Sequence, residues 1–181
     1  DHRPRARWGR FPLSGAWPGN EPVTVETEHM VLVGIGQLFA GSAERRTLVA
    51  RCLGSSAAVA LHDPEADVAG MLHWMLPESK IDRRRAAANP CLFADTGIPR
   101  LLAALVEVGA ERKRLRACLA GGASLPEGAG WDVGGRNRES GKRLLAAAGI
   151  RVQHEETGGV VVRELSLEAE FGAFLVRAMN V

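Results

Sequence analysis

The chain has 181 residues, of which 46% are hydrophobic and 24% are charged, and its formal net charge is +2. This length and composition are typical of one soluble globular domain that can bury a full core. The small net charge argues against a nucleic-acid-binding protein, and no segment approaches the roughly 18 consecutive apolar residues of a membrane-spanning helix. We therefore expect neither nucleic acid as a partner nor membrane insertion.

The cysteine pattern is that of a protein from a reducing compartment. Cys52, Cys91 and Cys118 are odd in number and lack CxxC spacing, which argues against a disulfide framework and against a zinc site. The sequence also has no GxSxG, P-loop, HExxH or dinucleotide-binding pattern. We expect a cytoplasmic protein with no metal and no cofactor.

Residues 1–29 differ in character from the rest of the chain. Prolines and glycines interrupt any hydrophobic period there, so an irregular N-terminal extension is predicted. The domain itself is expected to occupy residues 30–181 and to begin with an apolar strand at 31–36. Further along, the short apolar runs 47–50, 57–61 and 70–76 are bounded by Gly, Asp and Pro, which is typical of buried strands.

Two helices are predicted in the second half of the chain. After a polar, basic loop at 78–90, one apolar stripe indicates the first helix, with Asp95 or Thr96 as its N-cap, Pro99 in its first turn and Gly109 at its end. The second helix spans about 137–148. Strands are predicted at 115–119, 150–153, 160–164 and 174–177. Strands interleaved with helices indicate an α/β or α+β sandwich.

Several motifs follow one another along the chain. Leu53-Gly54-Ser55-Ser56 precedes the apolar run at 57–61, and Gly70-Met71-Leu72-His73-Trp74-Met75-Leu76-Pro77 follows it. The others are Val33-Gly34-Ile35-Gly36, Phe93-Ala94-Asp95-Thr96, Ala120-Gly121-Gly122-Ala123-Ser124, Val133-Gly134-Gly135-Arg136-Asn137 and Glu155-Glu156-Thr157-Gly158-Gly159. Their order and spacing resemble the CheD family, the chemoreceptor glutamine deamidases of bacterial and archaeal chemotaxis.

This resemblance implies a fold, an activity and two partners. The implied fold is a three-layer α/β/α sandwich with a mixed central sheet and two main helices. The implied activity is hydrolysis of glutamine side-chain amides on a methyl-accepting chemoreceptor to glutamate. The implied partners are that receptor and a CheC-like phosphatase.

The resemblance also assigns roles to residues. It places the family's nucleophilic cysteine at Ser56, its basic histidine at His73 and an orienting threonine at Ala50. A histidine within an apolar strand is commonly structural, but the matching residues on both sides of His73 favour the base.

The chemistry of Ser56 differs from that of a cysteine. Covalent amide hydrolysis needs an activated nucleophile, a base and donors for the oxyanion. A thiol gives up its proton near neutral pH, whereas a serine hydroxyl loses it only as attack occurs. The side chain of Ala50 can neither donate nor accept a hydrogen bond. Cys52 is expected to be a buried, inert thiol rather than a relocated nucleophile.

Several residues near Ser56 and His73 in the motifs are further candidates for the site. We expect Gly54, Ser55, Gly121, Gly122 and Ser124 to bind substrate. The glycines at 121 and 122 could equally mark a turn with positive φ. Arg136 and Asn137 could shape the site, but helix capping is favoured. The arginines at 83–85 are expected to form a solvated face.

Two functional hypotheses remain open. The first is a CheD-like protein with impaired catalysis that acts by binding a receptor or a CheC-like phosphatase. The alternative is an active hydrolase, either a protein-glutamine glutaminase or a receptor methylesterase, with Ser56 as nucleophile and His73 as base.

Overall fold

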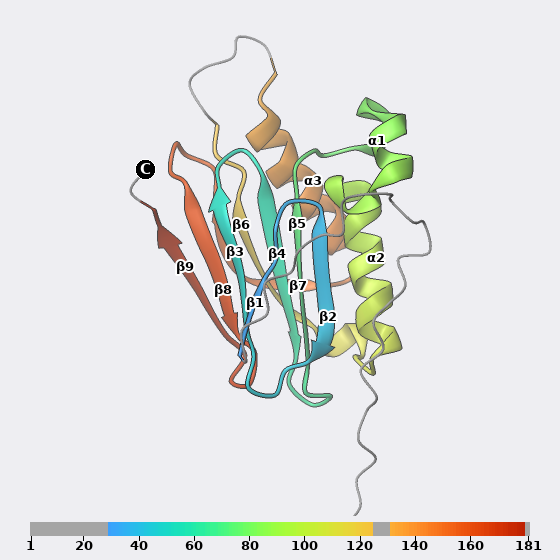
Figure 1. Cartoon of the computed structure of the whole chain (residues 1–181), viewed down its shortest axis with the longest axis vertical. Coiled ribbons are helices and arrows are strands. Elements are labelled where there is room, and N and C mark those ends of the chain that lie inside the picture. The colour runs from blue at the N-terminus through green and yellow to red at the C-terminus, as the bar shows by residue number, and fades with distance from the viewer. Residues whose placement is uncertain (1–28, 125–130, 180–181) are drawn as a thin grey trace, which may run out of the picture.

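The computed structural model describes residues 29–124 and 131–179 (Figure 1). The expected irregular extension therefore lies almost entirely outside the described residues. These residues contain nine strands: β1 (Met30–Leu32), β2 (Gln37–Ser42), β3 (Thr47–Leu53), β4 (Ala57–Asp63), β5 (Val68–Trp74), β6 (Arg116–Gly121), β7 (Arg151–Thr157), β8 (Arg163–Glu168) and β9 (Ala173–Ala178). The described α-helices are α1 (Arg83–Ala88), α2 (Ala94–Glu107) and α3 (Val133–Ala147), and short 3-10 turns occupy Ser79–Ile81, Pro90–Leu92 and Arg112–Arg114.

The strands form two mixed sheets. The larger sheet has the order β2-β5-β4-β6-β7, in which β6 and β7 are parallel and all other neighbours are antiparallel. The smaller sheet has the order β1-β3-β8-β9, in which β1 and β3 are parallel. The predicted closing strands thus separate, because β7 joins the larger sheet while β8 and β9 join the smaller one.

The larger sheet is the middle of three layers (Figure 1). Alternate residues of β4 point to opposite faces, so Val59 packs with the helix residues Leu101 and Leu145, while Ala60 packs with Leu48 and Leu167 of the smaller sheet. Because helices cover one face of the larger sheet and the smaller sheet covers the other, every residue of β4 and β5 is buried. The α+β class with a mixed central sheet is confirmed, and the third layer is a sheet instead of helices.

Two local features differ from the sequence-based expectations. Strand β2 was not predicted, and the expected basic loop at 78–90 contains helix α1, whose first turn is capped by Asp82 accepting from the Arg85 N–H. No residue of α1 is buried, so the helix has no apolar stripe that would mark it in the sequence.

The ends of the two long helices also differ. Asp95 does not cap α2, because its carboxylate accepts hydrogen bonds from the backbone and hydroxyl of Ser79. Pro99 lies inside α2 instead of in its first turn, whereas Gly109 follows the helix with φ 108° as predicted. Helix α3 begins at Val133, earlier than expected, with Asp132 as its N-cap.

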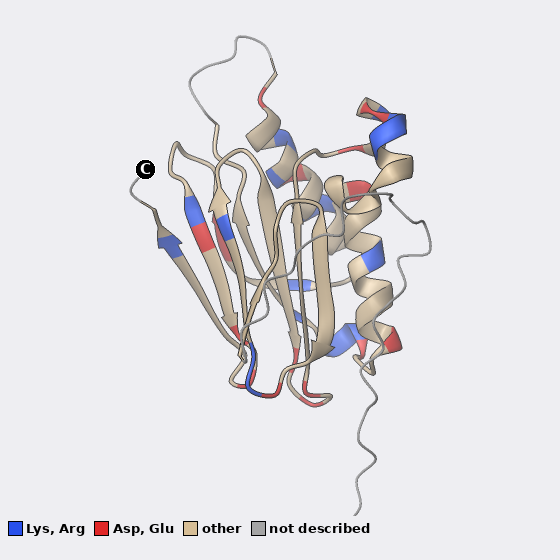
Figure 2. Ribbon diagram, viewed as in Figure 1, with Lys and Arg blue, Asp and Glu red and all other residues tan. Residues whose placement is uncertain are grey.

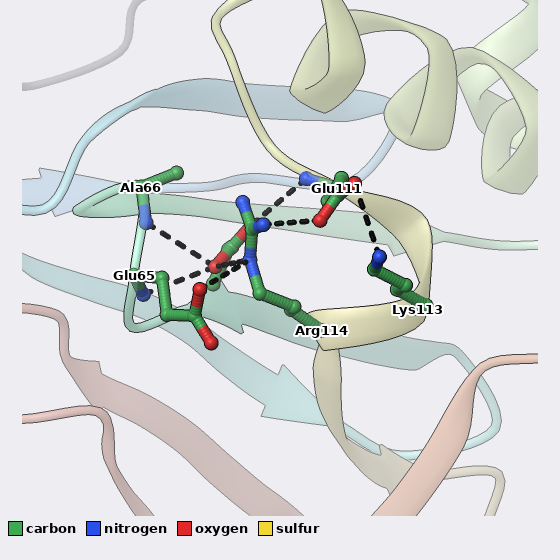
Figure 3. Close-up of polar contacts among 6 residues, drawn as sticks. Glu65, Ala66, Glu111, Lys113 and Arg114 are labelled. Atoms are coloured by element: carbon green, nitrogen blue, oxygen red, sulfur yellow. Dashed lines mark hydrogen bonds and ion pairs between the residues drawn. The ribbon is translucent and has the colours of Figure 1, made fainter.

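A buried carboxylate at the end of β4 connects the β4–β5 turn with the segment that leads from α2 to β6. Asp63, whose side chain is 0% exposed, ends β4 and forms an ion pair of 2.9 Å with Arg114. Its oxygens also accept from the backbone N–H groups of Glu65, Ala66 and Glu111 (Figure 3). Burial alone raises the pKa of Asp63, but these donors outweigh burial and hold its pKa well below the ordinary value.

Charge is otherwise kept at the periphery. Figure 2 shows Lys, Arg, Asp and Glu on helices, strand ends and the smaller sheet, while β4 and β5 are uncharged along most of their length. Within the described ranges, no helix is long and apolar enough to cross a membrane. The same residues contain no cluster of three or more His, Cys, Asp or Glu side chains arranged to hold a metal ion.

The Asp63 contacts predict a stability effect. Asp63→Asn keeps the shape of the side chain but removes its charge and one acceptor, so we expect a loss of about 2 kcal/mol in the free energy of unfolding, measured by urea denaturation. Glu65→Gln is the matched control, because the Glu65 side chain is 72% exposed and its loss should cost less than about 0.5 kcal/mol. Equal effects of the two substitutions would contradict this role for Asp63.

Candidate active site

Antiparallel pairing of β4 and β5 brings Ser56 and His73 together. Ser56 directly precedes β4, and His73 lies near the end of β5, opposite Ala58 in the register. The Ser56 Oγ is 2.9 Å from the His73 Nε2, and the two residues are 6% and 2% exposed. The predicted nucleophile and base positions are therefore in hydrogen-bonding contact.

His73 is held in its neutral form. Burial lowers its pKa to about 4, although a hydrogen bond with the Val33 carbonyl acts in the opposite direction. The tautomer that fits both contacts has the proton on Nδ1, facing the Val33 oxygen at 3.4 Å. The Nε2 is then free to accept the Ser56 hydroxyl proton, which is the arrangement of a general base and its nucleophile.

The position predicted for the orienting threonine provides no polar group. Ala50 lies in β3, is 0% exposed and belongs to the apolar cluster between the two sheets. The group that contacts the His73 Nδ1 is instead the backbone carbonyl of Val33, whose own N–H donates to the Val49 carbonyl at 2.8 Å. Sequence reasoning missed Val33, because a carbonyl is present in every residue and carries no sequence signal.

The turn at 121–123 supports the loop that contains Ser56. The Gly122 N–H donates to the Ser56 carbonyl and the Ala123 N–H to the Gly54 carbonyl, both at 2.8 Å. Gly121 has φ 97°, and a Cβ at this position would overlap the Ser56 carbonyl oxygen. Positive φ and close backbone approach therefore both require glycine at 121.

The other predicted substrate-binding residues lie around this loop. A Cβ on Gly54 would meet no atom within 4 Å, so this side of the loop is open. Ser55 is half-buried. The Ser124 hydroxyl donates to the Asp132 carboxylate, which also caps α3, so this side chain faces the helix end.

Asn137 lies at the site and does not cap α3, so the favoured capping role was wrong. Its side chain is 0% exposed, and its Nδ2 donates to the carbonyls of Ser55 at 2.8 Å and Met75 at 2.7 Å. Asp132 fills the capping position because its carboxylate accepts from the Gly135 N–H. An asparagine just inside a predicted helix gave no signal for this contact with distant loops.

Comparison with known proteins identifies the family. The family model described as CheD chemotactic sensory transduction matches residues 75–178. The "Probable chemoreceptor glutamine deamidase CheD" of Solibacter usitatus is 41% identical over 143 residues, covering 78% of this chain and 85% of that protein. The chain belongs to the CheD family.

Two further relatives match over most of their length. The "Probable chemoreceptor glutamine deamidase CheD" of Symbiobacterium thermophilum is 41% identical over 152 residues, covering 82% of this chain and 92% of the relative. The "Chemoreceptor glutamine deamidase CheD" of Thermotoga maritima is 39% identical over 151 residues, with the same coverage of 82% and 92%. The resemblance drawn from the motifs is thus confirmed.

The cysteines of this CheD-family chain differ in burial. The expectation of a buried Cys52 was wrong, because this residue is exposed, with φ 57°, where the pairing of β3 with β8 shifts register between Ala50 and Leu53. Such a shift turns side chains away from the face that simple alternation assigns them. Cys91 and Cys118 are buried, which raises the pKa of their thiols to about 11 and about 12.

The neutral state of His73 predicts a pH-dependent stability. The folded pKa is about 4 and the unfolded value about 6.5, so between them the unfolded chain binds a proton that the folded protein does not. Stability should therefore fall as pH decreases from about 6.5 to about 4, with His73 contributing about 3 kcal/mol of that loss.

His73→Gln should reduce this pH dependence, as measured by urea unfolding at pH 7 and pH 4. His154→Gln is the control, because the side chain of His154 is 49% exposed, and this variant should keep the dependence of the unaltered chain. An unchanged pH dependence in His73→Gln would contradict a neutral, buried His73.

The Gly121 contact predicts a second stability effect. Gly121→Ala introduces both positive-φ strain and overlap with the Ser56 carbonyl, whereas Gly149→Ala at φ 71° introduces strain in open space. Backbone strain should lower the free energy of unfolding by about 1 kcal/mol in each variant. The overlap should lower it by about 1 kcal/mol more in Gly121→Ala. Thermal unfolding of both variants measures the difference, and equal losses would show that the overlap is relieved.

Proposed function

We propose that this CheD-family protein binds a chemoreceptor, or a CheC-like phosphatase, and hydrolyses receptor glutamines at a strongly reduced rate. The observation that supports impaired catalysis is the environment of His73. Among the described residues, its two ring nitrogens contact only the Ser56 hydroxyl and the uncharged Val33 carbonyl, and burial holds its pKa at about 4.

A serine nucleophile makes a specific demand on this histidine. As the hydroxyl attacks an amide carbon, the Oγ–C bond forms and the C=O π bond opens to give an oxyanion. The hydroxyl proton passes to Nε2, which creates an imidazolium. In serine hydrolases a buried carboxylate stabilises that charge, and replacing it by a neutral group lowers turnover by about 10⁴-fold. Val33 offers a neutral carbonyl at 3.4 Å, so the imidazolium is poorly stabilised.

A cysteine in the same place would make a smaller demand. Its thiol transfers the proton to the histidine before attack, and the resulting thiolate and imidazolium stabilise each other across the contact. A carboxylate is then less needed. The described environment of His73 therefore suits the cysteine that the resemblance implies for this family better than it suits Ser56.

Binding does not depend on the reactive group. The loop at 54–56 is supported from behind by the turn at 121–123, and Gly54 faces open space. These features support a binding surface beside the pair for a receptor segment or a phosphatase, at which hydrolysis of receptor glutamines is slow.

One observation favours the second candidate, an active serine hydrolase. The 2.9 Å contact between the Ser56 Oγ and the His73 Nε2 is the distance that a working nucleophile and base require. Such an enzyme would act on receptor glutamine amides or, more readily, on receptor methyl esters, because an alkoxide leaves more easily than an amine. Its kcat/KM should rise through about pH 4 and stay level above that value.

The experiment compares four forms of the full chain on receptor fragments. Glutamine-to-glutamate conversion is followed by mass spectrometry for the unaltered chain, Ser56→Ala, Ser56→Cys and Ser56→Cys/Ala50→Thr, and fragment binding is measured for each. We expect Ser56→Cys to exceed the unaltered chain by roughly 10²–10⁴-fold, and all four forms to bind alike.

The alternatives separate clearly in this design. Rapid turnover by the unaltered chain that disappears in Ser56→Ala would establish the serine hydrolase. Absence of fragment binding by all four forms would overturn the receptor-binding proposal.

A further inference from the structure

Asn137 is a buried polar residue whose position neither helix capping nor apolar packing explains. It lies inside α3, its side chain is 0% exposed, and both of its amide hydrogens are donated to carbonyls on other elements. A buried side-chain amide requires such partners, because each unsatisfied polar group costs stability. The identity of the two carbonyls that accept these hydrogen bonds indicates what Asn137 does.

The two carbonyls belong to the segments that hold the reactive pair. Ser55 directly precedes Ser56, and Met75 lies just beyond His73 in the chain. The backbone pairing between β4 and β5 ends at Ala57 opposite Trp74, so Ser56 lies outside the last pair of the ladder. Asn137 bridges the Ser55 and Met75 segments just beyond the last β4–β5 backbone pair.

Helix α3 is also seated on this end of the sheet by other contacts. Gly141 approaches the Trp74 ring so closely that a Cβ would lie 2.9 Å from its Cζ2, and the Ser140 hydroxyl donates to the Pro77 carbonyl at 3.1 Å. The Asn137 amide is therefore not the helix's sole attachment. The Asn137 hydrogen bonds differ from the Ser140 bond because they reach both segments that flank the reactive pair, one at Ser55 and one at Met75.

We propose that Asn137 is a positioning residue that sets the distance between the Ser56 and His73 side chains by bridging the Ser55 and Met75 carbonyls. The inference rests on the proposed function only in taking this pair as the reactive site. The pair is separated by 2.9 Å, and a displacement of about 1 Å in such a site can cost about 100-fold in rate. Loss of the bridge should thus weaken the coupling between nucleophile and base while the fold persists.

The test measures that coupling without requiring turnover. The parent is the full chain with Cys52→Ser and Ser56→Cys, in which the exposed thiol is removed and the thiol introduced at position 56 is the probe. Iodoacetamide alkylation of this introduced thiol is followed against pH by peptide mass mapping. Cys91 and Cys118 should react slowly, because burial raises the pKa of their thiols to about 11 and about 12.

Three substitutions are compared in this parent. Asn137→Ser leaves one hydrogen-bond donor at position 137, and Asn137→Asp leaves none. Ser140→Ala is the matched control because it removes a buried hydrogen bond from the same helix. In the parent we expect an apparent thiol pKa below the ordinary value of about 8.5. The Asn137 variants should alkylate about tenfold more slowly at pH 7, with the apparent pKa moved toward about 8.5, while Ser140→Ala stays within about twofold of the parent.

Each result has one meaning. Alkylation of the Asn137 variants at the parental rate, or an equal loss in Ser140→Ala, would overturn the positioning role, as would failure of both Asn137 variants to fold by circular dichroism. A parental thiol with an unshifted pKa would instead overturn the reactive pair on which the proposed function rests. The two failures are therefore distinguishable.

Discussion

The antiparallel pairing of β4 with β5 is the constraint on which the rest of the site depends. These strands form the centre of the middle layer, buried by helices on one face and by the smaller sheet on the other. Because side chains alternate along a strand, a slip by one residue would turn His73 toward the opposite face. The burial of both faces therefore fixes the register, and the register places His73 beside Ser56.

The same burial sets the electrostatics of the site. Removing His73 from water lowers its pKa to about 4 and keeps the imidazole neutral, which a general base requires. It also makes an imidazolium costly, since the Val33 carbonyl is the group that faces Nδ1. A thiolate and an imidazolium share charge and tolerate this environment, whereas in serine hydrolases a buried carboxylate stabilises the imidazolium. The identity of residue 56 and the environment of residue 73 must therefore be considered together.

Much of the fold could be predicted from local pattern. The apolar runs that became β4 and β5 and the stripe that became α2 were recognisable because burial on a defined face imposes a period on the sequence. Helix α1 was not, because none of its residues is buried. The exposed position of Cys52 was missed because a register shift in β3 breaks the alternation on which such predictions depend.

Order, spacing and side-chain type are properties of the chain, so the motifs alone identified the family and the residue types at the candidate site: serine at 56, histidine at 73 and alanine at 50. What those residues contact is visible only in the folded protein. The Val33 carbonyl and the Asn137 amide come from segments far apart in sequence, and their roles depend on distances that no local pattern encodes. Hydrogen bonds act over a few ångströms in space, so the partners of His73 and Ser55 could be identified only after the sheets and helix α3 had been placed together.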